Sequence, residues 1–184
     1  MAIREIHHVA LTVSDLEKST AFYKNVLGFR KILDMPPGGP ALQRMLKLRP
    51  GTTSHAVILQ QGLSTVGQIE LIAFDPPADK RSGPKRPGDP GVFLLAFEVT
   101  GEELVEVHQR LQAQGIECTA EPQTFTLEGY GAIQTVVFED PDGVMIELMQ
   151  LPSVDEIRRR REAYRAERPQ PTAEDNYRKD VRLD

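Results

Sequence analysis

Residues 69–71 read Ile69-Glu70-Leu71, and the same three residue types return as Ile146-Glu147-Leu148. Each triplet lies in an apolar segment whose pattern is typical of a β-strand. A glutamate in such a strand is costly to bury unless a partner compensates its charge. Because the same arrangement occurs in both halves of the chain, the sequence predicts a paired site. A bound cation is the compensating partner that we expect.

Each triplet closes a module that begins with an apolar strand, over residues 6–13 in the first half and 93–99 in the second. Residues 14–17 and 100–103 then have the spacing of a capping box, in which Ser or Thr and Glu cap the start of a helix. Further strands are expected over residues 29–33, 54–60 and 66–74 in the first half, and over 116–119, 133–139 and 144–150 in the second. The sequence therefore predicts an α+β fold in which a βαβββ module occurs twice.

The two modules, residues 3–75 and 91–151, are predicted to form one domain over residues 1–151. A linker rich in Pro, Gly and charged residues joins them. Within the first module, residues 35–51 form a long loop with Met and Leu residues, which favours a lid over an apolar ligand. Residues 152–184 form a highly charged extension. We expect this extension to contain a helix, and either to pack on a partner subunit or to stay mobile.

The composition narrows the class of protein. The chain has 184 residues, of which 40% are hydrophobic, so it is long enough to bury a core. Its formal net charge of -5 argues against a general nucleic-acid binder, and no apolar run is long enough for a membrane helix. Met1 leads into a strand without a signal segment, and Cys118 is the single cysteine, which excludes an internal disulfide. We therefore expect a cytoplasmic protein that binds neither nucleic acid nor membranes.

Strand alternation assigns the polar residues to faces of the predicted sheets. His7 falls on the apolar, helix-packed face of the first strand, whereas His8 falls on the opposite face. Glu70 and Glu147 take the corresponding faces of their strands, and Leu94 takes the place of His8 in the second module. If these faces line one cavity, an imidazole and two carboxylates converge there, and such a set suits Zn²⁺, Mn²⁺, Fe²⁺, Co²⁺ or Ni²⁺. Taken singly, each residue also has a structural explanation, as a hydrogen-bonded histidine or a solvated carboxylate.

Further residues are candidates for substrate binding. Glu98 has the parity of the predicted cavity face, and is a candidate acid or base or a solvated residue. His55 is a candidate hydrogen-bond partner of a substrate or an ordinary strand-end histidine. Tyr130 lies in a loop flanked by glycines that would close over the cavity or cap the core. Met149 and Leu94 would make the cavity wall apolar, which suits an apolar ligand.

The sequence also carries a family likeness. It resembles the vicinal oxygen chelate superfamily, which includes glyoxalase I, methylmalonyl-CoA epimerase, extradiol dioxygenases and the fosfomycin and bleomycin resistance proteins. The segments that carry the resemblance are residues 8–16, 21–23, 26–29, 138–143 and 146–148. The resemblance covers about residues 3–150 and implies a glyoxalase-like cavity formed by two paired βαβββ modules.

The resemblance also implies a metal site. In such proteins the first and last strands of the modules hold the metal, which places ligands at His8, Glu70 and Glu147 of this chain. The fourth ligand, commonly a histidine, falls on Leu94, and leucine cannot bind a metal. Extradiol dioxygenases and fosfomycin-resistance enzymes use a histidine at this corner, so they are poorer guides to this chain than glyoxalase I and the epimerases.

Three functions are consistent with these residues. The favoured one is a metal-dependent enzyme of the isomerase or lyase type, glyoxalase- or epimerase-like, that transfers a proton on a small carbonyl or hydroxy-carbonyl compound, with Glu147 or Glu70 as the base. The first alternative is a metal-free binding or resistance protein that sequesters an apolar small molecule. The second alternative is a ring-cleaving dioxygenase. In each case we expect a homodimer.

Overall fold

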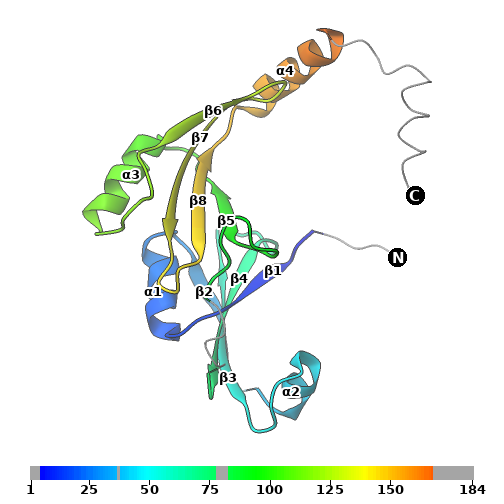
Figure 1. Cartoon of the computed structure of the whole chain (residues 1–184), viewed down its shortest axis with the longest axis vertical. Helices are drawn as coiled ribbons and strands as arrows, with labels where there is room; N and C mark the ends of the chain where they lie inside the picture. The colour runs from blue at the N-terminus through cyan, green and yellow to red at the C-terminus, as the bar shows by residue number, and fades with distance from the viewer. Residues whose placement is uncertain (1–4, 37, 78–82, 168–184) are drawn as a thin grey trace, which may run out of the picture. The chain divides into compact units, whose positions relative to one another are not determined.

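The structure of the chain is a computed structural model that describes residues 5–36, 38–77 and 83–167 (Figure 1). The described residues form two four-stranded sheets, one from each module, which confirms the predicted α+β fold. The first module contains β1 (His8–Thr12), α1 (Leu16–Asn25), β2 (Arg30–Met35), α2 (Pro40–Leu46), β3 (Thr53–Gln60) and β4 (Gln68–Asp75). The second contains β5 (Leu94–Glu98), α3 (Leu104–Ala113), β6 (Gln123–Leu127), β7 (Gly131–Glu139) and β8 (Met145–Gln150), and α4 (Val154–Glu167) follows it.

The strands follow the same order in both sheets. The first sheet has the order β1-β4-β3-β2, and the second has the order β5-β8-β7-β6. In the first sheet, β1 runs parallel to β4, whereas β3 is antiparallel to both β4 and β2. The last strand of each module therefore lies next to the strand that opens it, so each glutamate strand borders the strand of His8 or of Leu94.

The chain divides into two compact units, which do not coincide with the two modules. The first unit contains the described residues up to Leu95 together with Phe138–Ile146, which include the turn between β7 and β8. The second unit contains Ala96–Val137 and the described residues from Glu147 to Glu167. The β7–β8 turn thus packs with the first module, although it belongs to the second module in sequence.

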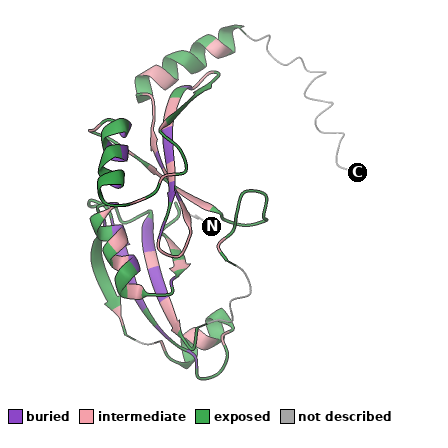
Figure 2. Ribbon diagram, turned by 60° about the vertical axis from the view of Figure 1, so that its left-hand side comes forward, coloured by how far each residue is buried: buried purple, intermediate pink, exposed green. Residues whose placement is uncertain are grey.

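One face of the first sheet is covered by α1, which contacts β4, β3 and β2. Tyr23 on the helix and Leu59 and Leu71 on the sheet are fully buried, and Figure 2 shows buried residues gathered on the sheet strands. The chain leaves the helix through Gly28, whose φ of 71° lies in the left-handed region that favours glycine. Because α1 occupies this face, the alternate residues of β1 and β4, His8 and Glu70 among them, project from the other face.

The helix starts are close to the predicted positions, but their caps differ from the predicted capping boxes. α1 is capped by Asp15, whose Oδ1 accepts the backbone N–H of Lys18 at 2.9 Å. Ser14, the predicted cap, instead donates its backbone N–H to the Asp142 carboxylate at 3.1 Å. α3 begins after Glu103, whose side chain makes no capping hydrogen bond. The prediction of a capping box at the start of each helix was therefore wrong.

The predicted strand over residues 116–119 is also wrong, because β6 spans Gln123–Leu127. In the predicted segment, Cys118 makes only an isolated bridge, and the half-buried Ile116 belongs to the loop after α3. All five residues of β6 are exposed. β6 is an edge strand on which burial imposes no hydrophobic pattern, and such a strand gives a weak signal in sequence.

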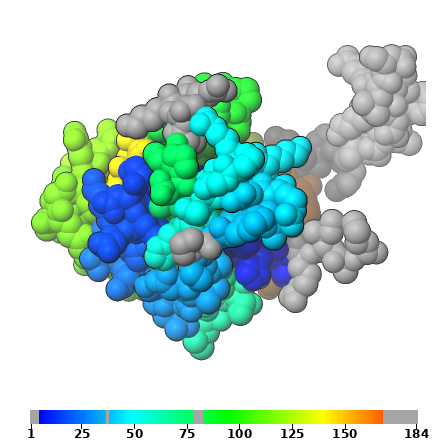
Figure 3. Space-filling view, turned by 90° about the horizontal axis from the view of Figure 1, so that it is seen from below, coloured from blue at the N-terminus to red at the C-terminus, as the bar shows by residue number. Residues whose placement is uncertain are grey.

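The long loop of the first module contains α2, a short helix without a buried residue. Figure 3 shows the segment that carries α2, in cyan, at the surface of the molecule. Met45 on this helix is 71% exposed. The proposed role of this loop as a lid stays a prediction.

The charged extension forms α4, in which Arg160 and Glu156 make an ion pair of 2.8 Å. The helix packs on the turn between β6 and β7, where a Cβ atom at Gly129 would lie 2.9 Å from Cγ of Tyr164. Glycine is thus needed at this position for the helix to approach the turn. α4 contacts its own chain, and its expected contact with a partner subunit stays a prediction. None of the helices in the described part of the chain has the length and apolarity to cross a membrane.

Candidate functional site

His8 and Glu70 meet on one face of the first sheet. In the parallel pairing of β1 and β4, His8 lies opposite Gln68 and Ala10 lies opposite Glu70. Paired residues share a face, and alternate residues of one strand do so too, so both side chains project to the same side. Nε2 of His8 lies 3.3 Å from Oε2 of Glu70, and the two side chains are 40% and 17% exposed. The structure thus brings together two of the three predicted metal ligands.

This separation suits two ligands of one ion. Zn–N and Zn–O bonds of about 2.1 Å, at an angle near 105°, place the two donor atoms roughly 3.3 Å apart. In the part of the chain that the structure describes, no three His, Cys, Asp or Glu side chains gather as a group that could hold a metal. Glu147 belongs to the second compact unit, so its convergence with the His8–Glu70 pair stays a prediction.

His8 has a second close neighbour in His7. The Nδ1 atoms of the two rings are 2.9 Å apart, and the rings meet edge to face with centroids 5.2 Å apart. His7 is exposed, so it does not occupy the helix-packed face predicted for it. The alternation rule failed here because β1 begins only at His8. Two adjacent histidines at the start of a strand were the signal from which this contact could have been inferred.

Glu147 on β8 is half-buried between two buried residues of the same strand, Ile146 and Leu148. Its Oε1 accepts a hydrogen bond from the hydroxyl of Thr135 on β7 at 2.6 Å. Thr135 is only 8% exposed. The partner of Glu147 in its own unit is therefore a neutral hydroxyl group, and sequence reasoning did not identify it, because a threonine in a strand is common for reasons of β-propensity alone.

The remaining candidates of the second module lie on β5 and β8. Leu94 is half-buried at the start of β5, and Glu98 is exposed at its end. Met149 is half-buried, and its carbonyl accepts the N–H of Val99, just after β5, at 2.8 Å. Leucine has no donor atom, so the position that corresponds to His8 offers only apolar contact. The substrate-binding roles of these residues stay predictions.

His55 projects from the other face of the first sheet. β3 pairs Ile58 with Glu70, and His55 lies an odd number of positions from Ile58, so its side chain is on the opposite side. Nε2 of His55 lies 2.6 Å from Oδ1 of Asp34. This contact, together with the Lys31 ammonium group, holds the pKa of the Asp34 carboxyl below its ordinary value. The structure thus gives His55 a surface partner and does not bring it to the face of Glu70.

Tyr130 contacts the charged extension. The guanidinium carbon of Arg161 lies 5.8 Å from the centroid of the Tyr130 ring, which is a cation–π distance. The backbone N–H of Tyr130 donates to the carbonyl of Leu127 at 3.0 Å and closes the turn after β6. Both contacts lie within the second unit. A role for Tyr130 in covering a ligand stays a prediction.

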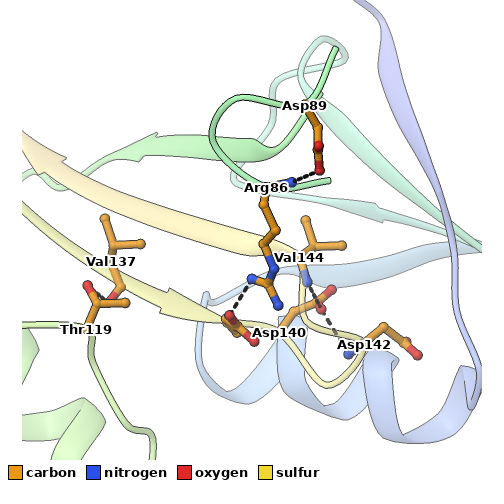
Figure 4. Close-up of polar contacts among 8 residues, drawn as sticks. Arg86, Asp89, Thr119, Val137, Asp140, Asp142 and Val144 are labelled. Carbon is orange, nitrogen blue, oxygen red and sulfur yellow. Dashed lines mark hydrogen bonds and ion pairs between the residues drawn. The ribbon is translucent and has the colours of Figure 1, made fainter. Parts of the chain in front are cut away.

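The β7–β8 turn carries a buried polar group that the sequence did not predict. Oδ1 of Asp140 accepts the backbone N–H groups of Asp142 and Val144, both at 2.9 Å (Figure 4). Oδ2 of Asp140 accepts the phenol of Tyr23, on α1, at 3.1 Å. Burial raises the pKa of Asp140, and it also raises the pKa of Tyr23, so the phenol keeps its proton and acts as the donor.

The same turn binds α1 at two further points. Asp142 accepts the backbone N–H of Ser14 at 3.1 Å and the hydroxyl of Ser19 at 3.2 Å. The linker joins it as well, because Nη1 of Arg86 lies 2.5 Å from Oε1 of Glu139. Both oxygens of Asp140 are engaged within the first unit. These contacts fasten the turn to the first module, and they give the turn a structural role.

Comparison with known proteins adds the family. The Glyoxalase/Bleomycin resistance protein/Dioxygenase superfamily matches residues 5–148. The chain is 28% identical over 148 residues to the 2-epi-5-epi-valiolone epimerase of Actinomyces sp, across 80% of each protein. It is 33% identical over 150 residues to the protein YwkD of Bacillus subtilis (strain 168), across 82% of this chain and 99% of that protein. A glyoxalase family protein from Bacillus cereus shares the fold, with a TM-score of 0.69 at 18% identity over 83% of this chain and 97% of that chain.

The matched region extends from before β1 into β8, so it includes both glutamate strands and the strands of His8 and Leu94. It ends before α4, which places the charged extension outside the shared fold. The chain therefore belongs to the Glyoxalase/Bleomycin resistance protein/Dioxygenase superfamily.

Proposed function

We propose that this chain is a metal-dependent enzyme of the vicinal oxygen chelate type, which transfers a proton at the carbon next to the carbonyl group of a small hydroxy-carbonyl compound. The observation that carries the proposal is the His8–Glu70 pair, an imidazole and a carboxylate 3.3 Å apart on the helix-free face of the first sheet. Similarity to the Actinomyces epimerase supports an isomerase over a lyase.

The proposed ligands are His8, Glu70 and Glu147. His8 offers a nitrogen donor, and the two glutamates offer anionic oxygens, which together suit a divalent ion such as Zn²⁺, Ni²⁺, Mn²⁺, Co²⁺ or Fe²⁺. Such an ion, when bound, polarises the substrate carbonyl and stabilises the negative charge that develops on its oxygen. Because Leu94 supplies no fourth donor, positions stay open for two neighbouring oxygens of the substrate.

A carboxylate of this set acts as the base. Epimerisation removes a proton from one side of a carbon and returns one to the other side, so two carboxylates from different strands suit it. Glu147 keeps one oxygen bonded to the Thr135 hydroxyl, and its other oxygen would accept a proton after it detaches from the metal. Glu70 has the His8 imidazole as its neighbour and is the second candidate.

Two measurements test this function. The first is the metal content of protein purified without chelator, for which we expect about one divalent ion per chain. The second is exchange of the hydrogen next to the carbonyl in D₂O, followed by proton NMR over a panel of hydroxy-ketones. We expect exchange that stops when a chelator removes the metal and returns when the metal is restored.

A pair of histidine variants makes the metal measurement specific. His8→Ala should abolish retention of the ion, whereas His55→Ala, which removes a histidine from the opposite face of the same sheet, should leave the metal content unchanged. Full metal content in His8→Ala would contradict the proposed ligand set. So would wild-type protein that takes up no ion after incubation with each of the candidate metals.

A binding protein without chemistry is the second candidate, and it has its own support. Leu94 is apolar where the family commonly has a ligand, and both Leu94 and Met149 are half-buried. Metal-free protein that binds an apolar fluorescent ligand, with the same affinity in wild type and in His8→Ala, would favour sequestration over catalysis.

A further inference from the structure

Both ring nitrogens of His8 face a partner. Nδ1 lies 2.9 Å from Nδ1 of His7, and Nε2 lies 3.3 Å from Oε2 of Glu70. A neutral imidazole has one N–H donor and one acceptor nitrogen, so the partner at one nitrogen decides what the other nitrogen can do. The exposed His7 ring can thus determine which nitrogen of the His8 ring carries the hydrogen.

The contact between the two histidines has two possible directions. If His7 donates from Nδ1, then Nδ1 of His8 is the acceptor and Nε2 of His8 carries its hydrogen toward Glu70, whose carboxylate can only accept. If His8 donates from Nδ1 to His7, then Nε2 of His8 has a free lone pair on the side of Glu70. Only the second arrangement can bind a cation through Nε2.

We propose that His7 is a positioning residue that accepts the Nδ1–H of His8 and so presents Nε2 of His8 as a metal ligand. The inference rests on the proposed metal site. Each ring remains neutral throughout: His8 gives up its Nε2 hydrogen and carries one on Nδ1, while His7 carries its own on Nε2 in place of Nδ1. A metal-bound histidine normally donates its other N–H to a carboxylate, a carbonyl or water, and His7 takes that part here.

The test compares variants of the full chain with Zn²⁺ as the probe. His7→Ala removes the acceptor, whereas His7→Asn keeps an amide oxygen near the place of Nδ1. We expect His7→Ala to lower the affinity for Zn²⁺ by about 10- to 100-fold, the usual effect of losing such a partner. His7→Asn should recover most of this loss, and His55→Ala should change nothing.

Nitrogen-15 NMR of the histidine rings gives a readout that a merely structural role would not move. On addition of Zn²⁺ to wild type, the hydrogen of His8 should be on Nδ1 and that of His7 on Nε2. In metal-free wild type, Nε2 of His8 should carry the hydrogen toward Glu70, and this preference should persist in His7→Ala because the carboxylate can only accept. Because His7 is exposed, the variants are expected to fold, and their backbone spectra check this.

The outcomes separate the two proposals. Equal Zn²⁺ affinity in wild type, His7→Ala and His7→Asn, with the hydrogen of His7 still on Nδ1 when Zn²⁺ is bound, would overturn the role of His7 and leave the metal site standing. Wild type that binds no Zn²⁺ would overturn the metal site, and the role of His7 with it.

Discussion

The two strand glutamates occupy equivalent places in their modules but have different partners. Glu70 on β4 has an imidazole on the neighbouring strand, 3.3 Å away. Glu147 on β8 accepts a hydrogen bond from the hydroxyl of Thr135, and the strand next to β8 carries Leu94 where the first module has His8. The repeated backbone therefore supports two different chemical settings, and the nitrogen donor is found only in the first.

The first helices of the two modules also differ in having polar residues in the first module where the second has apolar ones. α1 and α3 both have ten residues, and the equivalent buried positions are Ser19 and Tyr23 in α1 but Val107 and Leu111 in α3. The polar pair of α1 bonds to the two aspartates of the β7–β8 turn. The apolar pair of α3 has no polar group to satisfy. The helix of the first module thus has a polar pair where the helix of the second has an apolar pair, although α3 also buries His108, whose Nδ1 lies 3.2 Å from Oε2 of Glu121.

The largest effect is expected from Tyr23→Phe, which makes the first helix resemble the second. The change leaves Oδ2 of the buried Asp140 without its donor, which should lower the free energy of unfolding by about 2 to 3 kcal/mol. Leu111→Met, a change of similar volume at the equivalent position, should cost less than about 1.5 kcal/mol. Urea denaturation measures both, and equal losses would contradict the comparison.

Leu94→His gives the second module the donor of the first. A fourth ligand in place of water should raise the affinity for Zn²⁺ by about tenfold, measured by competition with a chelator. Val92→His, which adds a histidine at an exposed position before β5, is the matched control and should change little. An equal rise in Zn²⁺ affinity in both variants would mean that the added imidazole binds the ion independently of the proposed site.

Thr135→Val tests the partner of Glu147. The variant keeps the shape of the side chain and removes the hydroxyl donor, so we expect a loss of about 1 kcal/mol in the free energy of unfolding. Thr126→Val on the exposed strand β6 should stay within about 0.5 kcal/mol of wild type. If both variants matched wild type, the contact at Glu147 would carry no net energy.

The smallest effect is a pH dependence that belongs to the first unit. Burial raises the pKa of Asp140 in the folded chain above its value in the unfolded chain. The folded state therefore binds the proton of Asp140 more tightly than the unfolded state does. The stability that this proton contributes is fully present below the pKa of the unfolded chain, and it is lost as the pH rises through the pKa of the folded chain. Relative to Asp140→Asn, wild type should lose stability as pH rises from the ordinary carboxyl pKa of about 4 through the raised pKa of Asp140. Denaturation at several pH values would contradict this if the difference between the two proteins stayed constant.

The two glutamate strands could be predicted because each glutamate is adjacent in sequence to the apolar residues of its own strand. The pairing of His8 with Glu70 also followed from strand alternation, since alternation determines the face on which each side chain projects. β6 was predicted in the wrong place because an exposed edge strand needs no buried residues. The local sequence pattern was thus sufficient to locate a strand where burial constrained its residues. It was insufficient where the strand was exposed.

The contacts missed by sequence reasoning depend on partners that are distant along the chain or on small departures from regular structure. Tyr23 and Asp140 are separated by 117 positions, and nothing local to either residue indicates the other. Thr135 has the sequence appearance of any strand threonine. His7 contacts His8 because the regular strand begins one residue later than alternation assumed.

Anomalous X-ray scattering from crystals of this chain grown with Zn²⁺, recorded at the zinc absorption edge, tests the proposed site most directly. We expect one strong peak within bonding distance of Nε2 of His8 and of carboxylate oxygens of Glu70 and Glu147. A peak held by other residues, or well-ordered His8, Glu70 and Glu147 side chains with no peak between them, would contradict the account.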